Sequence, residues 1–173
     1  FGVSSIENLK EYNSVELGNN FELGTKYSEA MKLYYTDENG QNKPYYMGCY
    51  GIGLGRIAAC LIENNIIKNE KGLKGFAIPY NVAPYKVQII YSEKNKEKAE
   101  NLYEYLLNNN ISAILDDRDS LTIGNKINDV YVLGTPKMII LGNKFDGVSY
   151  EIEDTKTNEK IVTRFEEIVR VLM

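Results

Sequence analysis

Strand-like and helix-like segments alternate through the second half of the chain. Residues 85–91 and 111–115 are rich in β-branched residues, whereas residues 93–110 and 123–133 carry apolar side chains at helical spacing. A third strand-like run follows at residues 137–141. This alternation predicts parallel strands joined by right-handed helical crossovers.

The C-terminal residues complete the predicted α/β domain. Residues 148–162 predict an antiparallel hairpin that turns at Thr157 and Asn158, and residues 164–173 predict a short closing helix. The expected result is a mixed sheet of about five strands with helices on its faces.

A glycine-rich segment ends in an arginine in the first half of the chain. Residues 45–56 read Tyr-Tyr-Met-Gly-Cys-Tyr-Gly-Ile-Gly-Leu-Gly-Arg. Glycines let a ligand approach the backbone, the amides of a helix start favour an anion, and Arg56 adds donors that match phosphate oxygens. The segment therefore predicts a nucleotide site.

Three interpretations of this segment compete. The glycines could serve only tight packing, or they could form a dinucleotide fingerprint, although no parallel strand follows the helix promptly. In the third interpretation a nucleoside triphosphate lies on an antiparallel sheet. Residues 31–36 and 41–47 favour it, because they predict a β-hairpin around residues 37–40 that runs into the glycines. The helix from Arg56 to about Asn64 is apolar enough to be buried against that sheet, giving an α+β fragment.

Composition divides the chain into two regions. The chain has 173 residues, of which 43% are hydrophobic, and residues 64–84 are polar and rich in turn formers. They predict a linker crossing the surface, with a domain boundary near residue 82 between residues 1–82 and 83–173. The first region contains too few elements to enclose a nucleotide, so we expect a piece of a larger protein that is inactive alone. Residues 1–14 receive no role.

Several motifs together resemble the C-terminal part of bacterial-type prolyl-tRNA synthetases, which are class II aminoacyl-tRNA synthetases. The glycine run is similar to class II motif 3, and Gly24-Thr25-Lys26-Tyr27-Ser28 points to proline. In the second region, Asp116-Asp117-Arg118, Gly124-x-Lys126 and Leu133-Gly134-x-Pro136 resemble the anticodon-binding domain of the prolyl, threonyl, histidyl and glycyl enzymes. Class II motifs 1 and 2 have no counterpart in this sequence.

The resemblance assigns roles to single residues. It implies that Arg56 binds the phosphates of ATP, with Mg²⁺ accompanying the ATP, and that the adenosine lies against the backbone of three glycines: Gly51, Gly53 and Gly55. It places four residues at the proline pocket: Asn19, Phe21, Gly48 and Cys49. The chain departs from the family pattern at three positions, with Asn19 for a histidine, Glu22 for a glutamine and Gly55 for a serine or threonine.

Charge restricts how an RNA could bind to the second region. Residues 83–173 hold 12 Lys and Arg against 15 Asp and Glu, so general attraction to phosphates is weak and a local patch is needed. The candidates at one expected sheet edge are Asp117, Arg118, Lys126 and Lys144. Each could instead be an ordinary solvated charge.

The absence of histidine excludes Ser-His and Cys-His hydrolases and histidine-based zinc sites. Cys49 and Cys60 alone do not make a zinc site either, and Cys60 is most simply a core residue. The longest apolar runs are too short to span a bilayer, and we expect a cytoplasmic protein with reduced thiols. Adenylate formation needs no general base, only positioning and charge neutralisation.

The resulting hypothesis is a homodimeric enzyme that activates proline with ATP and transfers it to tRNA(Pro). Two alternatives remain open at this point. One is a non-catalytic tRNA-binding paralogue or accessory module, and the other is a sister synthetase for threonine, histidine or glycine.

Overall fold

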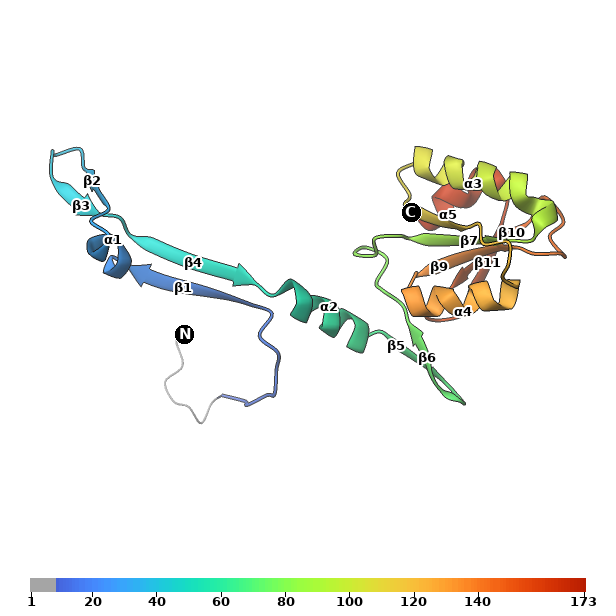
Figure 1. Cartoon of the computed structure of the whole chain (residues 1–173), viewed down its shortest axis with the longest axis horizontal. Coiled ribbons are helices and arrows are strands. Elements are labelled where there is room, and N and C mark those ends of the chain that lie inside the picture. Colours follow the sequence, from blue (N-terminus) through green and yellow to red (C-terminus); the bar gives the residue numbers. More distant parts are fainter. Residues whose placement is uncertain (1–8) are drawn as a thin grey trace. The chain divides into compact units, whose positions relative to one another are not determined.

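The computed structural model describes residues 9–173, which divide into two compact units at Cys60 and Leu61 (Figure 1). The first unit is built mainly from short strands. Its elements are β1 (Gly18–Gly24), α1 (Lys26–Ala30), β2 (Tyr34–Thr36), β3 (Asn42–Pro44), β4 (Met47–Ile52) and α2 (Leu54–Glu63), whose last residues enter the second unit.

The glycine-rich strand pairs differently from the sequence expectation. The predicted hairpin is present as β2 and β3 with a turn at Asp37–Gly40, but β3 ends at Pro44 instead of running into the glycines. The glycines lie in β4, which pairs antiparallel with β1. The strand β1 was not predicted, because most of its seven residues are polar or glycine.

The helix α2 begins at Leu54, two residues before the predicted start, and it is not buried. None of its residues falls in the buried class, although its apolar side chains gather on one face. The expectation of burial against the sheet is wrong for the described part of this chain. The reason is physical: the β1–β4 ribbon has only two strands, so it offers little apolar surface for a helix.

The second unit contains the predicted five-stranded mixed sheet. Its strand order is β11-β10-β9-β7-β8, with β8 and β9 parallel to β7 and with β10 antiparallel to both β9 and β11. The elements are β5 (Ile66–Asn69), β6 (Gly72–Phe76), β7 (Val87–Tyr91), α3 (Lys96–Asn108), β8 (Ala113–Asp116), α4 (Ile123–Leu133), β9 (Lys137–Leu141), β10 (Tyr150–Asp154), β11 (Lys160–Thr163) and α5 (Ile168–Leu172).

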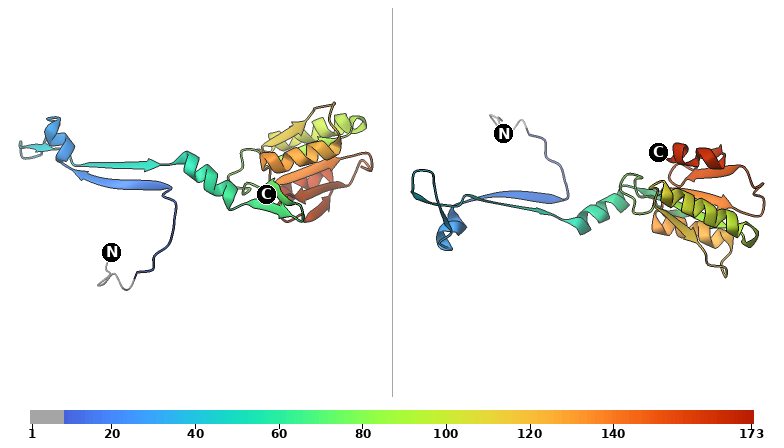
Figure 2. Two further views of the ribbon diagram at one scale, coloured as in Figure 1. Left: turned by 60° about the horizontal axis from the view of Figure 1, so that its bottom comes forward. Right: turned by 90° about the horizontal axis from the view of Figure 1, so that it is seen from above.

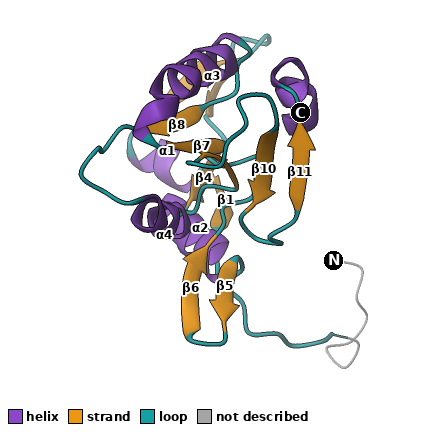
Figure 3. Ribbon diagram, turned by 90° about the vertical axis from the view of Figure 1, so that its right-hand side faces the viewer, coloured by secondary structure: helices purple, strands orange, loops and turns teal. Residues whose placement is uncertain are grey.

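Helices cover both faces of this sheet. Figures 1 and 3 show α3 and α4 on opposite sides of β7, and Figure 2 shows the second unit from two further directions. One core forms between α3, α5 and the sheet, and it includes Ile89, Leu102, Ile139 and Ile168, each fully buried. Full burial of such a side chain contributes about 1.5–3 kcal/mol, so this core dominates the stability of the unit.

The helix α4 has clear end signals. The Thr122 hydroxyl accepts a hydrogen bond from the Asn125 N–H at its start, and Gly134 ends it in the left-handed conformation with φ +73°. These signals explain why its predicted bounds agree with the structure.

The segment expected to be a surface linker instead forms the β5–β6 hairpin. Ile67 and Ala77 are buried in a second core with Val130 and Tyr131 of α4, and Lys74 Nζ lies 3.6 Å from the centre of the Tyr131 ring. The compact unit starts at Leu61, and Ile67 and Ala77 of this segment pack against α4. The domain boundary near residue 82 stays a prediction, since it lies within this compact unit.

Candidate functional site

Strand pairing in the first unit brings the predicted proline and ATP residues together. Asn19 of β1 pairs with Gly51 of β4, and Phe21 pairs with Cys49. Because side chains alternate along a strand and directly paired residues share a face, these four residues lie on one face of the ribbon. Gly48 pairs with Glu22 and belongs to the opposite face.

The Glu16 carboxylate connects the two parts of this face. Glu16 Oε1 accepts a hydrogen bond from Asn19 Nδ2 at 3.1 Å, and Glu16 Oε2 lies 3.8 Å from Arg56 Nη1. Both partners of the ion pair are more than half exposed, so Arg56 is not sealed in an interior pair. Glu16 received no role in the sequence analysis, and its position two residues before Gly18 was the available signal.

Two of the glycines leave room for these polar side chains. An added Cβ on Gly53 would lie 2.8 Å from Arg56 Nε, and one on Gly51 would lie 3.3 Å from Asn19 Oδ1. Gly55, in contrast, has no atom near the position of an added Cβ. An added Cβ would thus meet only the movable ends of Asn19 and Arg56 at residues 51 and 53, and nothing at residue 55.

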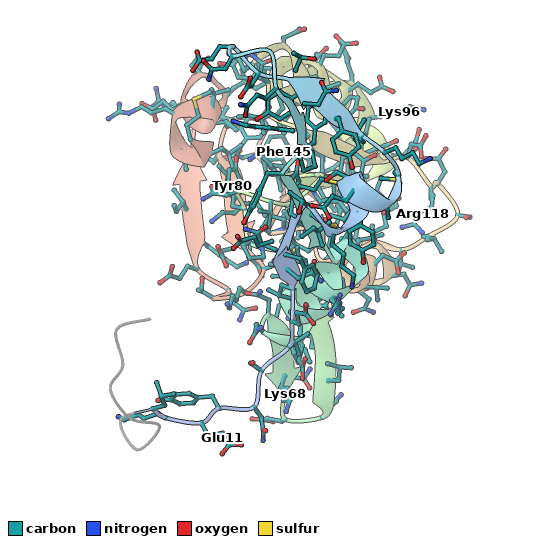
Figure 4. All side chains as sticks on the ribbon, turned by 90° about the vertical axis from the view of Figure 1, so that its left-hand side faces the viewer. Glu11, Lys68, Tyr80, Lys96, Arg118 and Phe145 are labelled. Atoms are coloured by element: carbon teal, nitrogen blue, oxygen red, sulfur yellow. The ribbon has the colours of Figure 1, made fainter. Side chains whose placement is uncertain are left out.

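In the second unit, Arg118 lies between two carboxylates. Its guanidinium donates to both oxygens of Asp116, at 2.8 and 2.6 Å, and contacts Asp129 Oδ2 at 2.7 Å. The hydrogen bond from Arg118 is the main reason why the pKa of Asp116 lies below its ordinary value. Arg118 remains 46% exposed and is labelled at the periphery of the side-chain view (Figure 4).

Lys126 is buried, unlike the solvated lysine that its sequence position suggests. Its ammonium donates to the main-chain oxygen of Asp116 at 2.8 Å and lies 3.9 Å from Asp116 Oδ1. The ring of Tyr91 lies below it, with its centre 4.9 Å from Nζ. Lys126 thus ties the end of β8 to the first turn of α4, and a direct contact with RNA stays a prediction.

Asp117 and Lys144, the other two candidates for RNA contact, are exposed and border cavities of this unit. Asp117 borders a cavity of about 320 Å³ beside Arg118 and Asp129. Lys144 borders a second cavity, of about 390 Å³, beyond the end of β9. Lys126 lines a third cavity, of about 490 Å³, at the start of α4. The ends of β7, β8 and β9 and the start of α4 thus carry the predicted residues at one sheet edge, as parallel pairing requires.

Within residues 9–173, no cluster of three or more potential metal-binding side chains occurs, and neither cysteine forms a disulfide. Cys49 is exposed and Cys60 is partly buried. In the same residues, no helix is both long and apolar enough to cross a membrane.

Known proteins resemble the chain in both units. Proline–tRNA ligases are similar to it: the protein of Aliarcobacter butzleri is 41% identical over 92% of this chain, and that of Thermosipho melanesiensis is 37% identical over 93%. The protein of Aquifex aeolicus is 41% identical over 88% of the chain. The resemblance drawn from the motifs is confirmed by these relatives. The chain spans only 26–28% of their length.

The model of one protein family, described as the anticodon binding domain, matches residues 82–173. These residues contain the whole five-stranded sheet together with α3, α4 and α5. The match covers more than half of the chain, and the chain therefore belongs to the anticodon-binding domain family.

Proposed function

We propose that this chain is part of a proline–tRNA ligase, which activates proline with ATP and transfers it to tRNA(Pro). The observation that carries the proposal is the combination of two units in one chain. The ribbon gathers Asn19, Phe21 and Cys49 with Gly51, and Arg56 follows in α2. The second unit belongs to the anticodon-binding domain family. Relatives with this name align with both units.

In the proposed first step, a carboxylate oxygen of proline attacks the α-phosphorus of ATP. A new bond joins that oxygen to phosphorus, and the bond to the leaving pyrophosphate breaks. Mg²⁺ brought with the ATP would neutralise phosphate charge. Arg56 would bind the terminal phosphates. Its guanidinium is exposed at the end of the glycine strand, and its ion pair with Glu16 is weak because it is exposed to solvent.

The other ribbon residues would bind adenosine and proline. Gly51 and Gly53 would admit the adenosine if the Asn19 and Arg56 side chains that now cover them move aside, and Gly55 leaves open space next to them. Asn19, Phe21 and Cys49, with the backbone of Gly48, would form a wall of the proline pocket.

The second unit would bind the anticodon of tRNA(Pro). Lys144 and Arg118 are exposed enough to contact phosphates or base edges, and Asp117 offers an acceptor to base amino groups. Lys126 would act mainly by holding the end of β8 in place. We further propose that the enzyme is a homodimer and acts in the cytoplasm.

The activity is tested by ATP–pyrophosphate exchange with the full-length protein. Proline should support exchange, whereas threonine, histidine and glycine should not. Exchange with one of these three instead would identify a sister synthetase. No exchange with any amino acid, combined with intact tRNA binding, would favour a non-catalytic tRNA-binding protein.

The anticodon assignment is tested by the double substitution Arg118→Ala and Lys144→Ala. The double variant should show a much higher KM for tRNA(Pro) in aminoacylation, while its rate of pyrophosphate exchange stays close to wild type. Equal loss of both activities would contradict the assignment. Lys126 is left unchanged in this test, because removing a buried ammonium would also disturb the fold.

A further inference from the structure

One carboxylate holds two side chains over the glycine strand. Glu16 lies just before β1, Asn19 lies within β1, and Arg56 lies in α2, which follows β4 (Figure 1). Glu16 Oε1 accepts a hydrogen bond from Asn19 Nδ2 at 3.1 Å, and Glu16 Oε2 lies 3.8 Å from Arg56 Nη1. Each oxygen of this carboxylate therefore serves a different partner.

The two partners of Glu16 cover neighbouring stretches of glycine backbone. Asn19 Oδ1 lies 3.3 Å from the position of a Cβ added to Gly51, and Arg56 Nε lies 2.8 Å from that of a Cβ added to Gly53. The adenosine of ATP is proposed to lie against these same glycines. A ligand that approaches this backbone must first displace both side chains.

The two contacts of Glu16 depend on each other. Both partners of the Glu16–Arg56 pair are more than half exposed, so water screens the pair and it contributes little alone. The hydrogen bond from Asn19 is exposed as well. Holding the long Glu16 side chain in one rotamer costs conformational entropy of about the size that one such contact offsets. The two contacts together offset this cost and either one alone does not, so the loss of one partner should release the other.

We propose that Glu16 is a positioning residue that couples the binding of ATP to the binding of proline. The inference rests on the proposed function, which assigns Arg56 to the phosphates and Asn19 to the proline pocket. Phosphates that take Arg56 away from Glu16 release Asn19 for proline, and proline that takes Asn19 releases Arg56 for ATP. Because such coupling is reciprocal, each ligand should raise the affinity of the other by the same factor.

Calorimetry of the full-length protein measures this factor. Proline is titrated with and without Mg²⁺ and α,β-methylene-ATP, an analogue that cannot form the adenylate. In wild type the analogue should lower the Kd of proline about 2- to 5-fold, the range that one exposed contact supplies. In Glu16→Gln, which keeps the shape of the side chain and removes its charge, the two affinities should become independent. The analogue alone should bind this variant about 2- to 5-fold tighter than wild type, because Arg56 is already free.

Glu29→Gln is the matched control. Glu29 is an exposed carboxylate of α1 in the same unit, and its side chain forms no hydrogen bond or ion pair within residues 9–173. This variant has the same change of net charge, so it reports any general electrostatic effect on ATP binding. It should keep the coupling factor of wild type, and both variants should keep the melting temperature of wild type.

Several results would overturn the proposal. One is that proline and the analogue bind the wild type independently, and another is that Glu16→Gln keeps the coupling. A third is that the analogue binds Glu16→Gln no more tightly than wild type. If that third result comes with a lower melting temperature, Glu16 has a structural role instead.

The design also separates this inference from the proposed function. The same titrations are made with threonine, histidine and glycine. If one of these binds in place of proline and its affinity depends on the analogue through Glu16, the proline assignment is wrong and the role of Glu16 stands. If proline and the analogue bind independently, the proposed function stands and the coupling is wrong. If neither the analogue nor any of the amino acids binds, both are wrong.

Discussion

Replacing Gly134 by alanine should destabilise the second unit strongly. Gly134 ends α4 at φ +73°, a conformation that costs an alanine about 1–2 kcal/mol. An added Cβ would also lie 2.6 Å from Cδ2 of Phe76 and still closer to its Cε2. Overpacking of this kind costs about 1–3 kcal/mol. The expected total is about 2–5 kcal/mol, a large share of the stability of a small domain.

Urea unfolding measures this loss. The chain has 14 tyrosines and no tryptophan, so tyrosine fluorescence and far-UV circular dichroism are the suitable signals. Gly147→Ala is the matched control: Gly147 also has a positive φ, +90°, but an added Cβ there meets only the flexible end of Lys98. That variant should lose only the conformational part, about 1–2 kcal/mol.

A double-mutant cycle isolates the contact with the hairpin. In a Phe76→Ala background, Gly134→Ala should cost only the conformational part, so the coupling between the two sites should be about 1–3 kcal/mol. Additive effects of Gly134→Ala and Phe76→Ala would refute the packing of β6 against the end of α4.

Three further predictions concern the sites and the acid stability. Arg56→Ala in the full-length protein should lower pyrophosphate exchange about 10²- to 10³-fold without changing the melting temperature, and an unchanged exchange rate would refute its phosphate role. Glu16→Gln should affect stability by less than about 1 kcal/mol in urea unfolding, because its ion pair with Arg56 is exposed; a larger loss would show that the pair is structural. Hydrogen bonds, chiefly from the Ser149 N–H, lower the pKa of Asp146 from 3.8 to about 2. The ionised carboxylate therefore stabilises the fold fully above pH 3.8, and this stabilisation is lost as the pH falls through 2. Asp146→Asn should therefore flatten the dependence of melting temperature on pH between these values, and parallel curves for variant and wild type would contradict this.

The second unit was predictable from sequence because its local signals agree with one another. The bounds of α4 follow from Thr122 and Gly134, and β9 follows from a short apolar run bounded by Pro136 and Gly142. The β5–β6 hairpin was missed because Lys68, Glu70 and Lys71 give it the composition of a loop. Its docking depends on Ile67 and Ala77, two apolar residues too far apart to form a pattern.

The identities of the candidate site residues could be predicted from the sequence more readily than the surroundings of their side chains. Strand pairing brings Asn19 and Cys49 to one face of the ribbon, and Arg56 follows in α2. The burial of Lys126 could not be predicted, because it depends on how α4 meets the sheet. Such contacts join residues from separate elements, and single-sequence periodicity carries no information about them.

The docking of the β5–β6 hairpin on α4 has a practical consequence for module exchange. A chimera that joins residues 82–173 to another enzyme would leave the buried side chains of Val130 and Tyr131 without their cover and invite aggregation. Transplanting residues 61–173 carries that cover along. The portable piece of this protein is therefore longer at its amino end than the family description indicates.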